Sequence, residues 1–148
     1  MKIAVGSDEK NHLTNFVIEE LKKKGFELEL HGPLKGDDIQ WAEVAQEVGE
    51  SVSKRKCEQG ILFCWTGTGV SMAANKVPGI RAALCFDAET ARGARKWNDA
   101  NILAMSLRLA TPIIAKEILD AWFTTTVEDE EIPNIEKVSV IENKYLKK

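Results

Sequence analysis

The chain has 148 residues, of which 44% are hydrophobic and 29% charged, with a formal net charge of −3. These values are typical of one globular domain spanning residues 1–148, and they exclude a disordered chain. No apolar run reaches the length of a membrane span and no signal-peptide pattern follows the N-terminus, so we expect a cytoplasmic protein without a membrane partner. Because the charges are scattered, we expect a small-molecule substrate and no nucleic acid.

Strand-like and helix-like segments alternate along the chain. Apolar or β-branched runs predict strands in KIAVGSD, FELELHG, GILFCW, GIRAALCF and NILAMSL. Helical spacing predicts helices within 11–25, 40–53, 69–75, 88–96 and 111–123. This alternation predicts an α/β fold, a three-layer Rossmann-like sandwich with a five-stranded parallel sheet.

The segment 124–148 follows the last strand-helix unit. Its apolar residues Ile135, Val138, Ile141 and Tyr145 suggest a C-terminal helix. We expect this extension to pack on the body or to reach a second subunit.

The three cysteines, Cys57, Cys64 and Cys85, lie far apart and form no C-x-x-C pair. Only His12 and His31 could join them as ligands. Neither a zinc site nor a disulfide framework is therefore expected.

The carboxyl ends of the expected strands carry the candidate site, since ligands bind there in parallel sheets. Asp8, Cys64 and the loop WTGTG all fall at such ends. The backbone amides of a glycine-rich loop can approach an anion, although Gly67 and Gly69 could instead serve only a tight turn. The loop lacks the lysine of a phosphate-binding P-loop.

Cys64 ends a buried strand and faces the start of a helix, where a thiol can act as base or nucleophile. The alternative is a small buried hydrophobe, which is our expectation for Cys57 and Cys85. The neighbouring Thr66 and the loop glycines favour a catalytic role.

The segment GILFCWTGTGVSMAANKVPGIRAALC resembles the signature of the ribose-5-phosphate isomerase B and galactose-6-phosphate isomerase family. The resemblance continues through ARKWNDANILAMSLRLATPIIAKEILDAWF and includes KIAVGSD, so it covers most of residues 1–123. Members of this family interconvert aldose and ketose phosphates through an enediol. They are homodimers or homotetramers with sites at subunit interfaces. The resemblance implies no metal or organic cofactor.

The resemblance also implies roles for individual residues. Cys64 would be the base that moves a proton between C1 and C2, while Thr66 and the loop amides of Gly67, Thr68 and Gly69 would hold the enediolate oxygen. Fixed donors suit this step because negative charge develops on that oxygen.

The substrate-binding residues implied by the resemblance come from several segments. Asp8 matches a sugar-binding aspartate, Asn98 a loop asparagine and Arg108 a phosphate-binding arginine, although Arg108 could instead form a surface salt bridge. Lys137 stands where an arginine is usual and would serve the neighbouring subunit's phosphate pocket.

Departures from the family pattern point to an altered substrate. Trp97 replaces a histidine that assists ring opening, Glu9 replaces a second histidine, and Trp65 replaces a glycine. Together with Trp41, Trp65 and Trp97 could form an aromatic wall that narrows the pocket, although Trp41 could equally be a core or interface residue.

Three functions remain open from the sequence. The first is an aldose-ketose isomerase acting on ribose 5-phosphate or a shorter relative, and a four-carbon sugar phosphate would need no ring opener. The second is a non-catalytic partner subunit of a hetero-oligomeric isomerase. The third is an enzyme of altered chemistry on a sugar acid, with Glu9 or His12 recruited.

Overall fold

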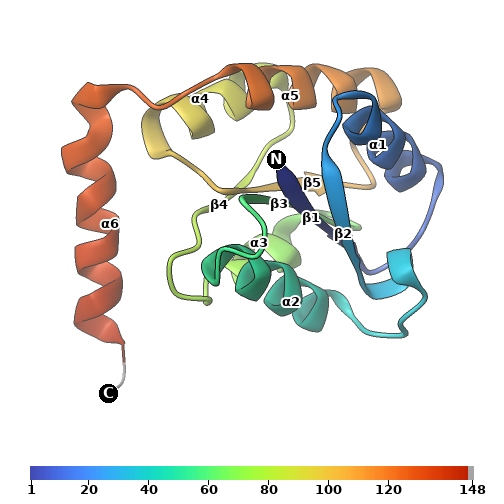
Figure 1. Ribbon diagram of the computed structural model, residues 1–148, viewed down its shortest axis with the longest axis horizontal. Helices are drawn as coiled ribbons and strands as arrows, with labels where there is room; N and C mark the ends of the chain where they lie inside the picture. The colour runs from blue at the N-terminus through green and yellow to red at the C-terminus, as the bar shows by residue number, and fades with distance from the viewer. Residues whose placement is uncertain (147–148) are drawn as a thin grey trace.

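Five parallel strands form the central sheet of the computed structural model, which describes residues 1–146 (Figure 1). The strands lie in the order β2-β1-β3-β5-β4. Their bounds are β1 Lys2–Ser7, β2 Glu27–His31, β3 Gln59–Cys64, β4 Ala82–Leu84 and β5 Ile102–Ser106. The expected parallel sheet is therefore confirmed.

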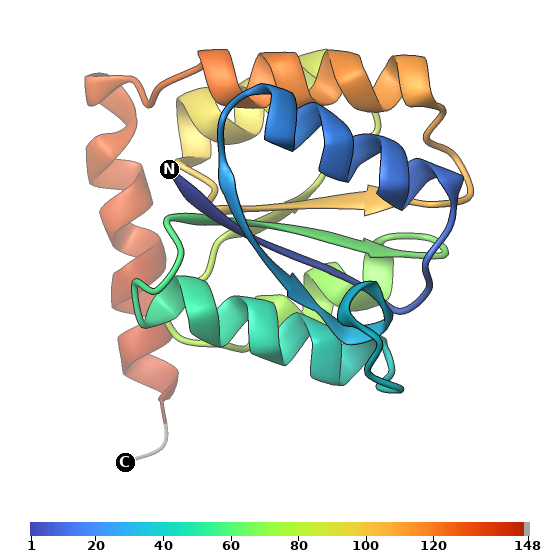
Figure 2. The ribbon, with the colours of Figure 1, turned by 45° about the vertical axis from the view of Figure 1, so that its right-hand side comes forward.

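Helices cover both faces of this sheet, with α1, α4 and α5 on one side and α2 and α3 on the other (Figure 2). Alternate residues of a strand point to opposite faces, so Ile61 and Phe63 pack under one layer while Leu62 and Cys64 pack under the other. The helices are α1 His12–Lys23, α2 Trp41–Ser53, α3 Thr68–Ala74, α4 Ala88–Asn98 and α5 Pro112–Thr124, with short 3-10 turns η1 Gly32–Lys35 and η2 Asp129–Glu131.

The fourth strand is shorter than the sequence predicts, because β4 keeps only three residues of the expected 79–86. It lies at the edge of the sheet and pairs only with β5. Gly79 has a φ of 83° and belongs to the preceding turn, while Phe86 at the other end is exposed. The apolar run thus continues beyond the part that hydrogen-bonds to a neighbour.

A final helix, α6 Ile132–Tyr145, stands apart from the other helices and beyond the amino-terminal ends of the strands (Figure 2). None of its residues is buried, and Val140, Ile141 and Tyr145 expose large apolar side chains. The carboxylate of Glu142 accepts a hydrogen bond from the backbone N–H of Gly79 at 3.1 Å. The predicted helix exists, but residues 147–148 of the extension lie outside the described residues.

No helix within residues 1–146 is long and apolar enough to cross a membrane.

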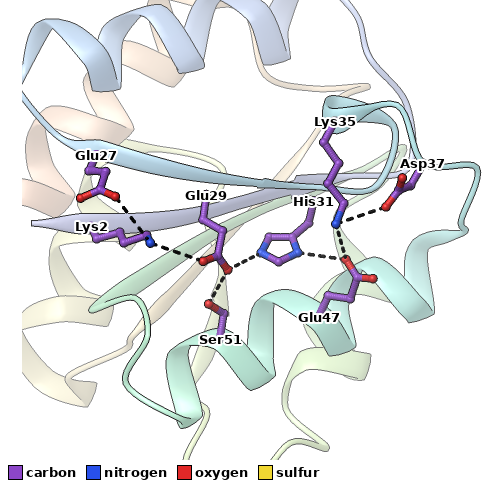
Figure 3. A network of polar contacts seen from close by, with 8 residues as sticks. All are labelled: Lys2, Glu27, Glu29, His31, Lys35, Asp37, Glu47 and Ser51. Atoms are coloured by element: carbon purple, nitrogen blue, oxygen red, sulfur yellow. Dashed lines mark hydrogen bonds and ion pairs between the residues drawn. The ribbon is translucent and has the colours of Figure 1, made fainter.

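A charged network joins β2 to α2 on one face of the sheet (Figure 3). The buried His31 ring has Glu47 Oε2 2.9 Å from Nδ1 and Glu29 Oε1 2.8 Å from Nε2. Ser51 donates to the same Glu29 oxygen at 2.6 Å, and Lys2 lies 3.6 Å from the other. These contacts fix α2, and therefore Trp41 at its first turn, relative to the sheet.

The hydrogen bond from Ser51 to Glu29 predicts a stability that depends on pH. This bond, followed by the one from His31, holds the pKa of Glu29 below its ordinary value. The resulting stability is present above the ordinary pKa of about 4.3 and is lost as the pH falls through the folded-state pKa. Ser51→Ala should lower the free energy of unfolding by about 1 kcal/mol at pH 7, and by less at pH 3.

Urea unfolding of both proteins at the two pH values measures this difference. Ser53→Ala is the matched control, because Ser53 donates to the backbone carbonyl of Pro78 and its effect should not change with pH. An equal loss for Ser51→Ala at pH 7 and pH 3 would contradict the role assigned to Glu29.

Candidate active site

The carboxyl ends of β1, β3 and β5 bring three loops to one edge of the sheet. Asp8 follows β1, Cys64 is the last residue of β3, and Arg108 comes two residues after β5. These strands are direct neighbours, so the three expected site residues share one edge of the molecule.

The Cys64 thiol points toward the face that α2 and α3 cover, and the residue is 5% exposed. Cys57 and Cys85 are buried, as expected for small hydrophobes, and Cys57 precedes β3 at the opposite edge of the sheet. Burial, with a smaller contribution from Asp87, raises the pKa of Cys85 to about 12, so its thiolate does not form near neutral pH. Cys85 follows β4 and packs in the core on the other face of the sheet, so Cys64 is the thiol that adjoins the WTGTG loop.

The loop after Cys64 is a tight turn with hydroxyls on its outer side. Gly67 has a φ of 78°, and a Cβ there would lie 2.5 Å from Leu84 Cδ1 and 3.0 Å from the Met105 carbonyl. Thr66 and Thr68 are exposed, with their hydroxyl oxygens 2.7 Å apart. No side chain caps the start of α3. The turn requires Gly67 structurally, and the amides at the start of α3 face outward from a helix end without a cap.

Two tryptophans lie beside this loop. The indole of Trp41 covers Gly69 so closely that a Cβ on Gly69 would lie 2.9 to 3.2 Å from three ring carbons. Trp41 is 43% exposed and is therefore not a core residue, while Trp65 is 58% exposed. These two side chains can contribute to the expected aromatic wall.

Backbone hydrogen bonds join the Cys64 loop to the Arg108 loop. The N–H of Leu107 donates to the Cys64 carbonyl at 3.0 Å, and the N–H of Arg108 donates to the Trp65 carbonyl at 2.9 Å. The Arg108 side chain is exposed and forms no ion pair within residues 1–146, contrary to the alternative of a surface salt bridge. Its guanidinium is available to an anion at this edge of the sheet.

The loop after β1 contributes further polar groups. Burial raises the pKa of the half-buried Asp8, and the neighbouring Glu9 raises it further. The Glu9 carboxylate is exposed and accepts from Asn11 Nδ2 at 3.2 Å. Lys10, which the sequence analysis missed, is exposed and lacks an ion-pair partner in the described part of the chain. Its place two residues after Asp8 was the available signal.

The remaining expected residues lie at the opposite edge. Trp97 and Asn98 end α4 and line a cavity of about 430 Å³ that α6 also borders. The length of β5 separates this edge from Cys64, which is about 15 Å for five residues. Lys137 is exposed on α6 and does not line the cavity. One chain therefore does not bring Trp97, Asn98 or Lys137 to Cys64, and its aromatic wall lacks Trp97.

No group of three or more His, Cys, Asp or Glu side chains among residues 1–146 is arranged to hold a metal ion.

Comparison with known proteins places this geometry in a family. The family model described as Ribose/Galactose Isomerase matches residues 3–141. The D-erythrulose-4-phosphate isomerase of Pectobacterium atrosepticum is 35% identical over 146 residues, covering 97% of this chain and 96% of that protein. The ribose-5-P isomerase B of Listeria innocua is 38% identical over 123 residues, covering 82% of this chain and 83% of that protein.

The structural comparison agrees. The structure of Clostridium thermocellum ribose-5-phosphate isomerase B has a TM-score of 0.91 and 37% sequence identity, covering 99% of this chain and all of that one. The chain therefore belongs to the ribose/galactose isomerase family, and it is an aldose-ketose isomerase.

Gly67→Ala tests whether the turn after Cys64 depends on close packing as well as on a positive φ. Any alanine at this φ is strained, and here its Cβ would also meet Leu84 and the Met105 backbone. We expect a loss of more than about 2 kcal/mol in the free energy of unfolding. Gly25→Ala is the matched control, since Gly25 has a φ of 81° and nothing within 4 Å of the added Cβ.

The control should lose only about 1 kcal/mol, the backbone part of the cost. Urea unfolding measures both variants. Equal losses would show that the contact of Gly67 with Met105 is not needed.

Proposed function

We propose that the protein interconverts D-erythrulose 4-phosphate and the corresponding aldose phosphate, a four-carbon pair. The observation that carries this proposal is Trp97, a tryptophan where the resemblance places a ring-opening histidine. His12 and His31 are the only histidines of the chain, and His31 is held between Glu29 and Glu47. No histidine is left at the end of α4 to open a sugar ring.

A four-carbon substrate removes the need for that step. The phosphate ester occupies the terminal oxygen that would otherwise close a five-membered ring, so the sugar phosphate stays open. A relative of this name supports the same substrate, because the D-erythrulose-4-phosphate isomerase of Pectobacterium atrosepticum is 35% identical over 97% of the chain.

The proposed chemistry uses one base and a set of fixed donors. The Cys64 thiolate removes a proton from C1 of the ketose, and the electron pair moves to the carbonyl oxygen to give a cis-enediolate. Thr66 and the amides at the start of α3 donate to that oxygen. The thiol exchanges its proton with solvent while the enediol is bound and then gives a proton to C2, as the hydroxyl proton of C1 passes to O2, so the product has the composition of the substrate.

Arg108 and Lys10 are the proposed phosphate ligands on the cysteine side. Both are exposed cations at the carboxyl edge, and neither is neutralised by a carboxylate within residues 1–146. A phosphate dianion bound by both would orient the chain of the sugar toward Cys64.

The proposed activity predicts a clear substrate order. The ratio kcat/KM should be at least about tenfold higher for D-erythrulose 4-phosphate than for D-ribulose 5-phosphate, because binding one carbon more or less in a pocket changes discrimination by this order. Cys64→Ala should lower kcat by about 10² to 10⁴. Cys57→Ala is the control, since Cys57 is buried away from the loops.

An NMR assay of product formation measures all three proteins. Faster turnover of the five-carbon substrate would refute the proposed chain length, and an active Cys64→Ala variant would refute the cysteine base.

We also propose that the working site forms between two copies of the chain. Trp97, Asn98 and Lys137 lie at the edge opposite Cys64, so they could join it only from a second chain. Apolar side chains exposed at the carboxyl edge support this assembly, as do those on α6. They are Trp65, Phe86, Leu109 and Ile113 on the edge and Val138, Val140, Ile141 and Tyr145 on α6.

Mixing two inactive variants tests the shared site. Cys64→Ala and Asn98→Ala should each be inactive alone, because each damages one half of every site. After unfolding and refolding together, about a quarter of native activity should return, since half of the dimers are mixed and each has one intact site. Absence of recovery in a confirmed mixed dimer would place both residues in the same chain's site.

A further inference from the structure

We propose that Ser106 is a positioning residue, whose hydroxyl sets the Cys64 loop relative to the Arg108 loop. This inference rests on the proposed function for its kinetic consequence, but the contacts that carry it are independent of the substrate.

Ser106 is the last residue of β5 and is 2% exposed. Its Cα is paired in register with that of Cys64 on the neighbouring parallel strand. Residues paired in this way project toward the same face of the sheet. The hydroxyl and the thiol therefore leave adjacent strands on one side, at the edge where the loops begin.

The Ser106 hydroxyl makes two hydrogen bonds, and each reaches a different loop. It donates to the Trp65 carbonyl at 3.0 Å and accepts from the N–H of Leu109 at 3.1 Å. The Trp65 carbonyl also accepts from the N–H of Arg108 at 2.9 Å. The Ser106 hydroxyl thus donates to Trp65, which follows the base Cys64, and accepts from Leu109, which follows the phosphate ligand Arg108.

These bonds fix the peptide that leads from Trp65 into Thr66. The orientation of this peptide sets where the Thr66 hydroxyl and the following amides point. The other links between the loops are backbone contacts. They are the hydrogen bonds donated by the N–H groups of Leu107 and Arg108, and the close approach of Gly67 to Met105. Among these links, those of Ser106 are made by a side chain. Replacing Ser106 therefore loosens the junction and leaves the backbone hydrogen bonds of the sheet in place.

A change of about 1 Å in the placement of reacting groups can cost up to about 10²-fold in rate. Ser106→Ala should therefore lower kcat by about 10- to 100-fold while KM changes by less than about threefold. Ser106→Thr, which keeps the hydroxyl, should retain kcat within about threefold. Ser106→Cys keeps a side chain of similar size, but its thiol is a weak donor, so kcat should fall as it does in Ser106→Ala.

Ser53→Ala is the control for the loss of a serine hydrogen bond. Ser53 is the last residue of α2, at the end of the helix opposite Trp41, and donates to the Pro78 carbonyl at 2.6 Å. It should lower the melting temperature as Ser106→Ala does, with native kcat and KM. An equal kinetic loss in both variants would overturn the positioning role, because loss of stability alone would explain it.

A second measurement does not depend on the substrate. The rate of alkylation by iodoacetamide, followed for each thiol by peptide mapping, should rise at least about threefold at Cys64 in Ser106→Ala, as the loop that covers it loosens. The rates at Cys57 and Cys85 should stay unchanged and serve as internal references. Ser53→Ala should leave the rate at Cys64 unchanged.

The kinetic measurement and the alkylation measurement together separate the failure of this inference from the failure of the proposed function. If the native protein turns over no sugar phosphate, the proposed function fails, and faster alkylation at Cys64 in Ser106→Ala still supports the junction. Native kinetics or unchanged alkylation of Cys64 in a folded Ser106→Ala variant would overturn the role of Ser106.

Discussion

The hydrogen-bonded junction between the loops after β3 and β5 is the contact on which the site depends. The strands are neighbours in the sheet, and the backbone of residues 107 and 108 donates directly to Cys64 and Trp65. A parallel sheet brings such loops to one edge, but it does not fix their relative position. The junction adds that constraint, so the loops that carry Cys64, Thr66 and Arg108 are held in one relative position.

The charged network under α2 supports the same edge from a distance. His31 and Ser51 connect the outer strand to the helix through Glu29 and Glu47 (Figure 3). Because α2 begins with Trp41, the position of this helix determines how the indole lies over Gly69. His31 and Ser51 are the buried members of this network and both are hydrogen-bonded, which restricts the arrangement of a helix that forms one wall of the site.

The sequence was sufficient for most of the fold, because buried parallel strands have continuous apolar runs and their helices have clear periodicity. It also located Asp8 and Cys64 at one edge, since this follows from the ends of two strands, whereas Arg108 was identified by the family resemblance. It did not show that Trp97 and Asn98 lie at the other edge, because motif similarity carries no information about distance. The role of Ser106 was missed for a similar reason, since its partners come from two loops and depend on strand register.

Solvent isotope incorporation tests the central claim, proton transfer by Cys64 on an open four-carbon sugar phosphate. In deuterated buffer, the native protein should convert D-erythrulose 4-phosphate into an aldose phosphate that carries deuterium at C2, detected by NMR. The Cys64→Ala variant should incorporate none over the same time. Aldose formed without deuterium would point to a hydride shift instead of an enediol, and native-like incorporation in the variant would assign the base to another residue.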